Sequence, residues 1–487
     1  MSSEVQRLLD TITGAVKSLD VACSSSGTVV PNINEPFQPS SENFRGSHEA
    51  LQAARIISAA ALQLEAIVAP PQVVLYHVVG GFFKSMALRV CLESNVTEIL
   101  REAGSKGMHI CDIAKHNGQD SQKLARFLRY LCSNHVYREV SPDVFANNRV
   151  SSLLDTKKSI EELRSRPLDK YKNTDGMAAL AGHHLDECFK GAAYAWEALN
   201  DPNIIHAKEH IGTPLNKAYN SQTPYFKFIQ NDDRRRLRFD VSMQGMERLQ
   251  PPDTTLNAFD WGNLPKGSKV VDVGGGVGSV FFPLAEKFPE LKLVIQDLPG
   301  VIDSAKKIWS ERMPSALQTG QVKPEAHNFF NEQPHGDTSV FFLKHVLHNW
   351  SDSSCVEILK RLRDASGEST RLVIMDSAMP YVCRSQSQEN PPTTSTCIPG
   401  IEPEEAPDPL LANYGALNEM SHVLDMVMFV ILNTQERTYE QLNSLLNDSG
   451  WSVSSVRRKP GDAAFVQIEA KPQKYHESDS TSSQARL

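Results

Sequence analysis

The sequence VVDVGGGVGS at residues 270–279 joins an apolar strand to a turn that contains four glycines. A strand followed by such a turn is typical of sheets that bind an adenosine-bearing ligand. The nicotinamide fingerprint is G-x-G-x-x-G, whereas here the glycines read G-x-G-x-G and Ser279 stands where the third glycine of that pattern belongs. Asp272 places a carboxylate at the strand end, where it would repel a pyrophosphate. The turn therefore favours a cationic ligand over a dinucleotide.

Strands and helices alternate from residue 268 onward. We expect strands at 269–273, 291–296, 338–344 and 371–376, with helical segments between them. Alternation of this kind predicts a mostly parallel sheet whose two faces are covered by helices. The fold class is therefore α/β.

Two of these strands carry polar groups to their carboxyl ends. Asp297 follows the second strand, about twenty residues beyond the glycine turn, where an acidic side chain can accept hydrogen bonds from ribose hydroxyls. Lys344 and His348 follow the third strand, at the edge where reacting groups gather in open α/β sheets. Residues three apart on a strand point to opposite faces, so we expect only one of His345 and His348 to face the cleft unless the strand ends between them.

The amino-terminal half is mainly helical. Apolar residues recur at helical spacing over 3–20 and 46–68, with a polar linker between the two segments. Residues 83–150 then predict three helices, the first over 83–104, followed by a two-stranded ribbon, which is the order of a winged helix. The apolar faces of the first two helices need a partner, and a second copy of the chain is the simplest one. We therefore expect a homodimer.

These patterns divide the chain into four parts. We expect a helical and winged-helix dimerisation domain at 1–165, a helical connecting region that contributes to a substrate pocket at 166–258, an α/β domain at 259–472 and a disordered tail at 473–487. Within the α/β domain, residues 382–409 are rich in Ser, Thr, Pro and Glu without periodicity, which predicts a mobile surface insertion.

Composition excludes several classes of protein. The 487 residues are 40% hydrophobic and 22% charged, and the net charge of -8 gives no general attraction to nucleic acid or to an anionic membrane. Eight cysteines without a C-x-x-C pair favour reduced thiols in a cytoplasmic protein. No signal peptide is visible, and no uninterrupted apolar run reaches the length of about 18 residues expected of a membrane span.

Winged helices often bind DNA. Lys123, Arg126 and Arg129 share one face of the third helix, where they could approach a groove. Three charges on an acidic chain are a weak footprint for nucleic acid, however. We therefore expect no nucleic-acid partner.

Four motifs occur in order along the second half: VDVGGGVG at 271–278, DLP at 297–299, LKHVLHNWSD at 343–352 and ERT at 436–438. Together they resemble the S-adenosylmethionine-dependent O-methyltransferases of the plant caffeic acid type and their fungal relatives, over roughly residues 80–470. The resemblance implies a winged-helix dimerisation domain before a Rossmann-like methyltransferase domain. It also implies S-adenosyl-L-methionine as the cofactor and a small aromatic hydroxyl compound as the substrate.

The resemblance further implies a histidine general base that two acidic residues orient. On this chain the base is His348, and the acids are Asp376 and Glu436. A phenol has a pKa near 10, so an imidazole that takes its proton makes it a better nucleophile. A carboxylate on the second ring nitrogen fixes the tautomer and stabilises the imidazolium. No metal is required, and His345 is expected to be structural or to line the substrate.

The family pattern also assigns binding residues, with two departures in this chain. Asn328-Phe329 stand where the family usually has Asp-Met, although an Asn carbonyl can still accept from the adenine amino group. Asp376 stands where Glu is common in the plant enzymes, which shortens the reach to His348 by one methylene. The cofactor residues are Asp272, Gly274, Gly276, Asp297, Leu298, Asn328, Phe329 and Lys344, and the substrate residues are His183, Met243, Met246 and Asn433. For two of these a structural role is an open alternative: His183 is structural or lines the substrate, and core packing accounts for Met246 as well as a substrate contact does.

Three other functions were weighed against this reading. Ser279 and Asp272 disfavour a nicotinamide oxidoreductase, and the charge disfavours a DNA-binding regulator. The sequence does not exclude a non-methylating reaction that uses the bound sulfonium as an electrostatic group. The identity of the aromatic acceptor does not follow from the sequence.

Overall fold

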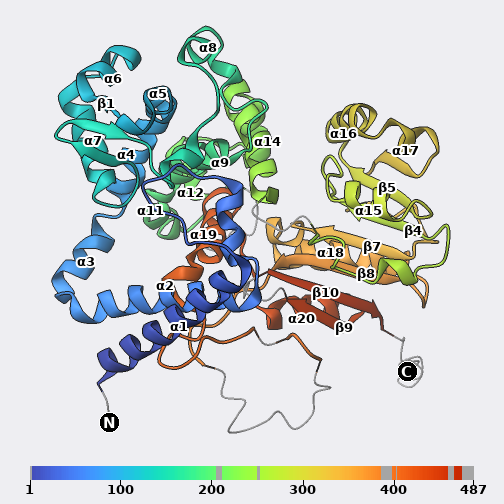
Figure 1. The fold of residues 1–487 in the computed structure, drawn as a ribbon. Helices are drawn as coiled ribbons and strands as arrows, with labels where there is room; N and C mark the ends of the chain where they lie inside the picture. The colour runs from blue at the N-terminus through green and yellow to red at the C-terminus, as the bar shows by residue number, and fades with distance from the viewer. Residues whose placement is uncertain are drawn as a thin grey trace, which may run out of the picture. The chain divides into compact units, whose positions relative to one another are not determined.

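A computed structural model describes residues 3–204, 211–248, 253–384, 398–401, 403–458 and 465–473 (Figure 1). The chain forms two compact units, each of which is described separately. Unit 1 comprises Met1–Pro251, Tyr381–Arg384 and Glu405–Asn433, and unit 2 comprises Pro252–Pro380, Ser385–Glu404 and Thr434–Leu487. The expected domain boundaries at residues 165 and 258 stay predictions.

Unit 2 is built on a seven-stranded sheet with the strand order β6-β5-β4-β7-β8-β10-β9. The first five of these strands are parallel, and β10 runs antiparallel to both β8 and β9. The four expected strands are present within two residues of their predicted bounds, whereas β6, β9 and β10 were not expected. The strands are β4 (Lys269–Val273), β5 (Lys292–Asp297), β6 (Val322–Ala326), β7 (Val340–Lys344), β8 (Arg371–Ser377), β9 (Trp451–Arg458) and β10 (Phe465–Pro472).

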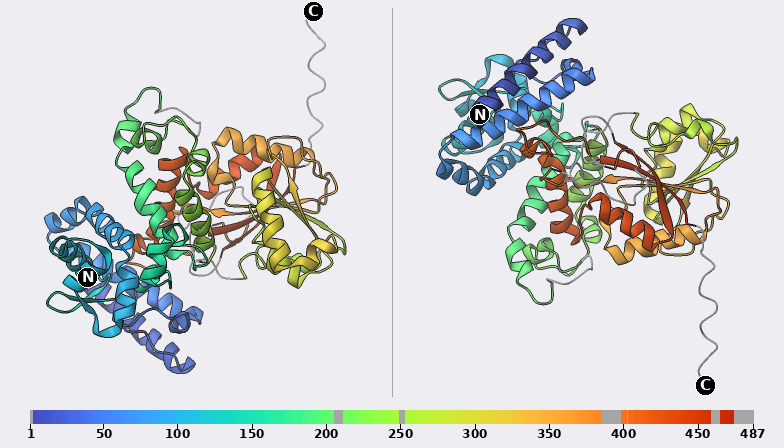
Figure 2. Two further views of the ribbon diagram at one scale, coloured as in Figure 1. Left: turned by 90° about the horizontal axis from the view of Figure 1, so that it is seen from above. Right: turned by 90° about the horizontal axis from the view of Figure 1, so that it is seen from below.

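Helices cover both faces of this sheet, as predicted (Figures 1 and 2). Successive residues of a strand pack on opposite faces: in β7, Phe341 and Leu343 join one buried apolar cluster, and Val340 and Phe342 join the other. The first cluster is completed by α18 and α20, and the second by α15 and α16. Their bounds are α15 (Phe281–Lys287), α16 (Pro299–Arg312), α18 (Asp352–Asp364) and α20 (Tyr439–Asp448).

The glycine turn after β4 needs glycine for both backbone and packing reasons. Gly274, Gly276 and Gly278 have φ values of 69°, 59° and 73°, a region that costs other residues about 1–2 kcal/mol. A Cβ on Gly278 would lie 2.2 Å from Cδ1 of Ile295 and 3.1 Å from Nε1 of Trp309. Because Gly278 has no side chain, the turn can pack closely against β5 and α16.

Unit 1 contains the expected helical and winged-helix elements, with one correction. The helix predicted over 83–104 is two helices, because the chain turns at Asn95, whose φ is 58°. A three-stranded sheet, in the order β1-β3-β2, forms the wing. The elements are α1 (Glu4–Ser26), α2 (His48–Val68), α4 (Phe82–Glu93), α5 (Val96–Ala103), β1 (Met108–His109), α6 (Ile110–Asn117), α7 (Ser121–Cys132), β2 (Arg138–Ser141) and β3 (Val144–Ala146).

Large apolar side chains are exposed on helix α3 (Pro71–Val79), which has no buried residue. Tyr76 and Val78 are each 74% exposed. Two helices, His48–Val68 and Gly415–Leu432, are long and apolar enough to cross a membrane by length and composition alone. The sequence search for uninterrupted apolar runs missed them because each mixes small and polar residues into an apolar average. Within unit 1, α2 packs against α1, and α19 (Glu419–Leu432) packs against α12 (Pro214–Ala218).

Half of the predicted insertion at 382–409, residues 385–397 and 402, lies outside the described residues, as does the tail from 474 onward. The described parts of its two ends are bonded together. Arg384 donates to the carbonyls of Ala406 and Leu410 at 3.0 and 2.7 Å and pairs with Glu405. The mobility of the insertion stays a prediction.

Candidate active site

The carboxyl ends of the parallel strands bring the predicted polar residues of unit 2 to one edge of the sheet. Asp272 lies near the end of β4, Asp297 ends β5, Lys344 ends β7 and Asp376 lies near the end of β8. Because the strands are parallel and in register, these ends share one edge.

His348 lies on a 3₁₀ turn, η7 (Leu347–Asn349), just beyond the end of β7. Its Nδ1 is 2.6 Å from Oε1 of Glu436 and 3.8 Å from Oδ1 of Asp376. The three residues are buried, with exposed fractions of 8%, 4% and 2%. The contact with Glu436 makes Nδ1 the proton donor, which leaves the lone pair of the neutral ring on Nε2. Asp376 stands where Glu is common in the plant enzymes, and the contact of this shorter side chain with His348 is longer than a hydrogen bond.

The charges of this cluster raise the pKa of His348. Burial alone would lower this pKa, but the carboxylates of Glu436 and Asp376 outweigh it and raise the pKa to about 9. Burial would raise the pKa of Asp376, but His348 and His345 outweigh that effect and lower it. The cluster therefore stabilises an imidazolium at its centre.

Arg437 holds the turn that carries His348, a role that the sequence analysis missed. Its guanidinium donates to the carbonyls of Leu347 and Trp350 at 2.9 and 2.7 Å and to Asp352 Oδ1 at 2.9 Å. Its own carbonyl accepts from the N–H of Met379, just after β8. Arg437 therefore ties the segment with Glu436 to both strand ends. The signal was present in the ERT motif, where the arginine directly follows Glu436.

His345 lies beside the same carboxylate. The strand ends at Lys344 and His345 has a φ of 53°, so His345 and His348 do not lie on opposite faces of one strand. Their ring centroids are 5.2 Å apart, and Nδ1 of His345 lies 3.7 Å from Oδ1 of Asp376. One ligand atom from each of these three residues falls within 4.8 Å of the others, which is a spacing that could hold a metal ion.

The glycine turn and Asp297 form the predicted cofactor region. Asp297 accepts hydrogen bonds from the N–H groups of Gly276 at 2.9 Å and Leu298 at 2.7 Å. A carboxylate has about four lone-pair positions, so acceptor capacity remains for two ribose hydroxyls. Burial raises the pKa of Asp297. These donors and acceptors fit an adenosine-bearing ligand.

Asn328 and Phe329 follow β6 at the same edge. A Cβ on Gly274 would lie 3.2 Å from the Phe329 ring, so the ring closes over the glycine turn. Oδ1 of Asn328, the atom expected to accept from an adenine amino group, accepts from the N–H of Phe330 at 3.1 Å. Its second lone pair is the one that could accept from the ligand.

The four predicted substrate residues belong to unit 1. His183 is buried on α9 (Met177–His183), and Asn433 caps α19 with a φ of 56°. Met243 is exposed and Met246 half-buried, one turn apart on α14 (Asp233–Arg248). Their approach to His348 stays a prediction.

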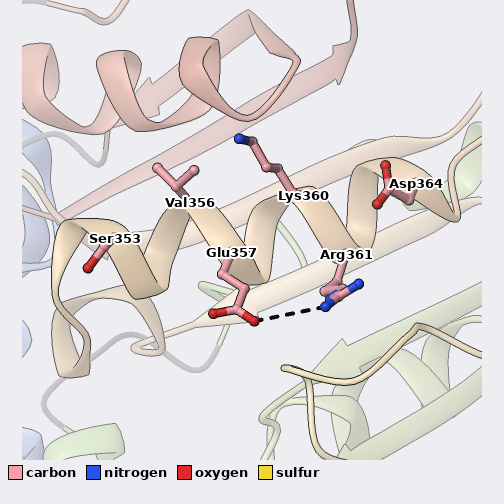
Figure 3. Close-up of a pocket in the computed structure, with 6 residues that line it drawn as sticks. All are labelled: Ser353, Val356, Glu357, Lys360, Arg361 and Asp364. Carbon is pink, nitrogen blue, oxygen red and sulfur yellow. Dashed lines mark ion pairs between the residues drawn. The ribbon is translucent and has the colours of Figure 1, made fainter.

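Two other surfaces carry none of the predicted chemistry. A surface hollow of about 410 Å³ lies along α18. Figure 3 shows side chains that line it, among them Val356, Lys360 and the ion pair of Glu357 with Arg361, whose atoms are 3.9 Å apart. On the winged helix, Arg129 pairs with Glu139 and Asp143, which neutralises one of the three cations considered for DNA.

Comparison with known proteins agrees with this arrangement. A family model described as an O-methyltransferase domain matches residues 196–394, and an O-methyltransferase dimerisation domain matches residues 76–157. The chain is 45% identical over 474 residues to 4-O-methyltransferase 1 of Phanerochaete chrysosporium, which covers 97% of this chain and 100% of that protein.

Solved structures are similar in fold. The structure of LepI in complex with SAM has a TM-score of 0.64 and 18% identity, and covers 86% of this chain and 94% of that chain. A pericyclic reaction enzyme has a TM-score of 0.66 and 17% identity, and covers 96% of this chain and 100% of that chain. At these identities the likeness concerns the fold alone.

The two carboxylates lie at unequal distances from His348, and this predicts which of them raises its pKa more. We expect Glu436→Gln to lower the pKa of His348 from about 9 further than Asp376→Asn does, because the Glu436 contact is 2.6 Å and the Asp376 contact 3.8 Å. Histidine NMR titration measures both values. Asp303→Asn, on α16, is the matched control and should leave the pKa unchanged. A larger drop for Asp376→Asn would contradict the assignment of Glu436 as the main partner.

Proposed function

The chain belongs to the O-methyltransferase family and uses S-adenosylmethionine, and from this premise we propose that it methylates a phenolic hydroxyl with His348 as the general base. The observation that carries the proposal is the buried contact of 2.6 Å between His348 and Glu436. An imidazole held this way has a fixed tautomer and a defined proton-accepting atom, Nε2.

The residues of unit 2 act on the proton of the acceptor. Nε2 of neutral His348 takes the phenolic proton, and Glu436 and Asp376 stabilise the imidazolium that forms. Arg437 keeps the turn in place, so the base is held in its orientation. Asp297 and the glycine turn hold the adenosine portion of S-adenosylmethionine, whose sulfonium supplies the methyl group. Positioning of the reactants accounts for most of the acceleration in such a transfer.

The acceptor class rests on unit 1. Met243 and Met246 offer flexible thioethers, which make favourable contacts with aromatic rings. Asn433 would add a polar contact, whereas both ring nitrogens of His183 already contact Glu187 and Cys188. The name of the 45% identical relative, 4-O-methyltransferase 1, supports an oxygen acceptor. A small aromatic hydroxyl compound fits these residue types.

The base is tested by separating His348 from His345. We expect His348→Asn to lower turnover by about 100-fold to 10,000-fold, the range for a positioned base, and His345→Asn to change it much less. The loss should shrink for phenols with electron-withdrawing groups, since a phenolate needs no base. Single-turnover assays with labelled S-adenosylmethionine and a panel of phenols measure this, and product mass distinguishes methylation from a non-methylating reaction. An inactive His345→Asn beside an active His348→Asn would refute the assignment.

The pH dependence follows from the same cluster. Only neutral imidazole accepts a proton, and the raised pKa means that His348 is protonated below about 9 in the free protein. The value of kcat/KM should therefore rise with pH up to about 9 in the same assays.

Asp297 is the proposed ribose contact. Asp297→Ala should weaken binding of S-adenosylmethionine by about 1 kcal/mol or more, because buried hydroxyls would lose an acceptor. Titration calorimetry measures the affinity. Asp303→Ala, on the exposed side of α16, is the control. Unchanged affinity for Asp297→Ala would remove this residue from the cofactor site.

We propose that the protein is a homodimer formed through unit 1. The matched dimerisation domain, residues 76–157, begins at the exposed apolar surface of α3 and α4. Tyr76, Val78, Val79, Phe82 and Phe83 are 47% to 74% exposed there, and covering them would remove a large apolar area from water.

Light scattering tests this assembly. The wild-type chain should have about twice the monomer mass of 54.0 kDa at micromolar concentration. Val78→Glu should shift the mass toward the monomer, since it places a charge in the proposed interface. Val29→Glu, at an equally exposed position in the linker between α1 and α2, should leave the dimer intact. A wild-type monomer would exclude the proposal.

A further inference from the structure

A second group of buried ionisable side chains lies in unit 1, where α9 continues into a π-helical turn, η5 (His184–Cys188). Nε2 of His183 is 3.6 Å from Sγ of Cys188, and Nδ1 of His183 is 2.8 Å from Oε1 of Glu187. Cys188, His183 and Glu187 are only 5%, 2% and 0% exposed. A π-helical turn brings residues five apart onto the same face, which places the thiol against the imidazole.

The carboxylate of this group is held in place by ion pairs. Arg238 contacts Glu187 and donates to Asp186 at 2.8 Å, and Arg89 donates to Asp186 at 2.6 Å. A fixed carboxylate orients the imidazole, and the imidazole in turn can take the proton of the thiol. Thiol, imidazole and carboxylate in this order are the arrangement of an activated nucleophile. The proposed methyl transfer assigns no task to Cys188 or Glu187.

From this geometry we propose that Cys188 is a modification site that reacts with small neutral electrophiles of the α,β-unsaturated carbonyl class, including quinones. The imidazole of His183 takes the thiol proton, and the sulfur electron pair forms a C–S bond at the β carbon. The π electrons of the alkene move to the carbonyl as an enolate. The imidazolium then returns the proton, so the adduct contains all atoms of both reactants and no oxidant is needed.

The surroundings of His183 favour its protonated form. Burial would lower the pKa of His183, but Cys188 and Glu187 outweigh it and raise the pKa to about 10. Burial raises the pKa of Tyr225 well above its usual value, so that phenol stays neutral. The ionisable groups that face the pair are Glu187, His184, Tyr225, Arg235 and Arg238.

The apolar side chains around the thiol should favour neutral reagents over charged ones. Cys188 belongs to a buried apolar cluster with Leu215, Tyr225, Ile229 and Val427. A charged reagent would lose its hydration on entering this cluster, which is costly. Neutral electrophiles should therefore react faster than charged ones with the same reactive group.

The experiment measures maleimide addition to the full-length protein by peptide mass spectrometry. We expect Cys188 to react with N-ethylmaleimide at pH 6 about tenfold or more faster than Cys91 and Cys355, since His183 lies 3.6 Å from its sulfur and can take the thiol proton. Cys91 and Cys355 are matched internal controls, because both are fully buried and burial raises the pKa of both thiols. The negatively charged 3-maleimidopropionate should react with Cys188 more slowly than N-ethylmaleimide does.

Two further results decide the role of His183. The rate at Cys188 should exceed the rates at Cys91 and Cys355 at both pH 6 and pH 8, because His183 lies beside this thiol alone of the three. His183→Gln should reduce the rate at Cys188 to that of Cys91. Equal rates at Cys188 and Cys91 in the wild-type protein would overturn the proposal, and this comparison does not require a variant to fold.

Discussion

The contact between His348 and Glu436 is the constraint on which the arrangement of unit 2 depends. A buried imidazole and a buried carboxylate are costly unless they pair. The two residues are 88 positions apart in the sequence, so the chain must return to the edge where β7 ends. Arg437 holds the returning segment in place. Its side chain bonds to the turn that carries His348, and its carbonyl bonds to the residues just after β8. Arg437, the residue next to Glu436, thus fixes the position of His348.

Much of unit 2 could be predicted because its parallel strands are short apolar runs. The parts that were missed have physical reasons. β6 contains Pro324 and charged residues, a pattern that argues against a strand but is tolerated at the edge of a sheet, where β6 lies. β9 and β10 form an antiparallel pair, whereas the alternation of strands and helices predicts parallel strands, so it gave no sign of them.

The candidate site shows the same limit at the level of single residues. His348 and Glu436 lie in the ordered motifs and Asp376 was assigned from the family resemblance, and the structure brings the three together. The position of His345 does not follow, because it depends on where β7 ends and on a φ of 53°, which no sequence pattern here announces. The glycine pattern of the turn ends at Gly278, one position earlier than in the nicotinamide fingerprint, and the sequence analysis took this as evidence against a dinucleotide. The structure adds a packing reason, since the turn at Gly278 packs against Ile295 and Trp309.

Two buried histidines in this chain are each held by a glutamate at Nδ1, and their remaining neighbours separate their chemistry. His348 has a second carboxylate nearby, so the pair of acids stabilises a proton that arrives from outside. His183 has a thiol at Nε2, so its proton already has a source within the protein. The same imidazole–carboxylate pair therefore suits a base for an incoming hydroxyl in unit 2 and an activator of a resident nucleophile in unit 1.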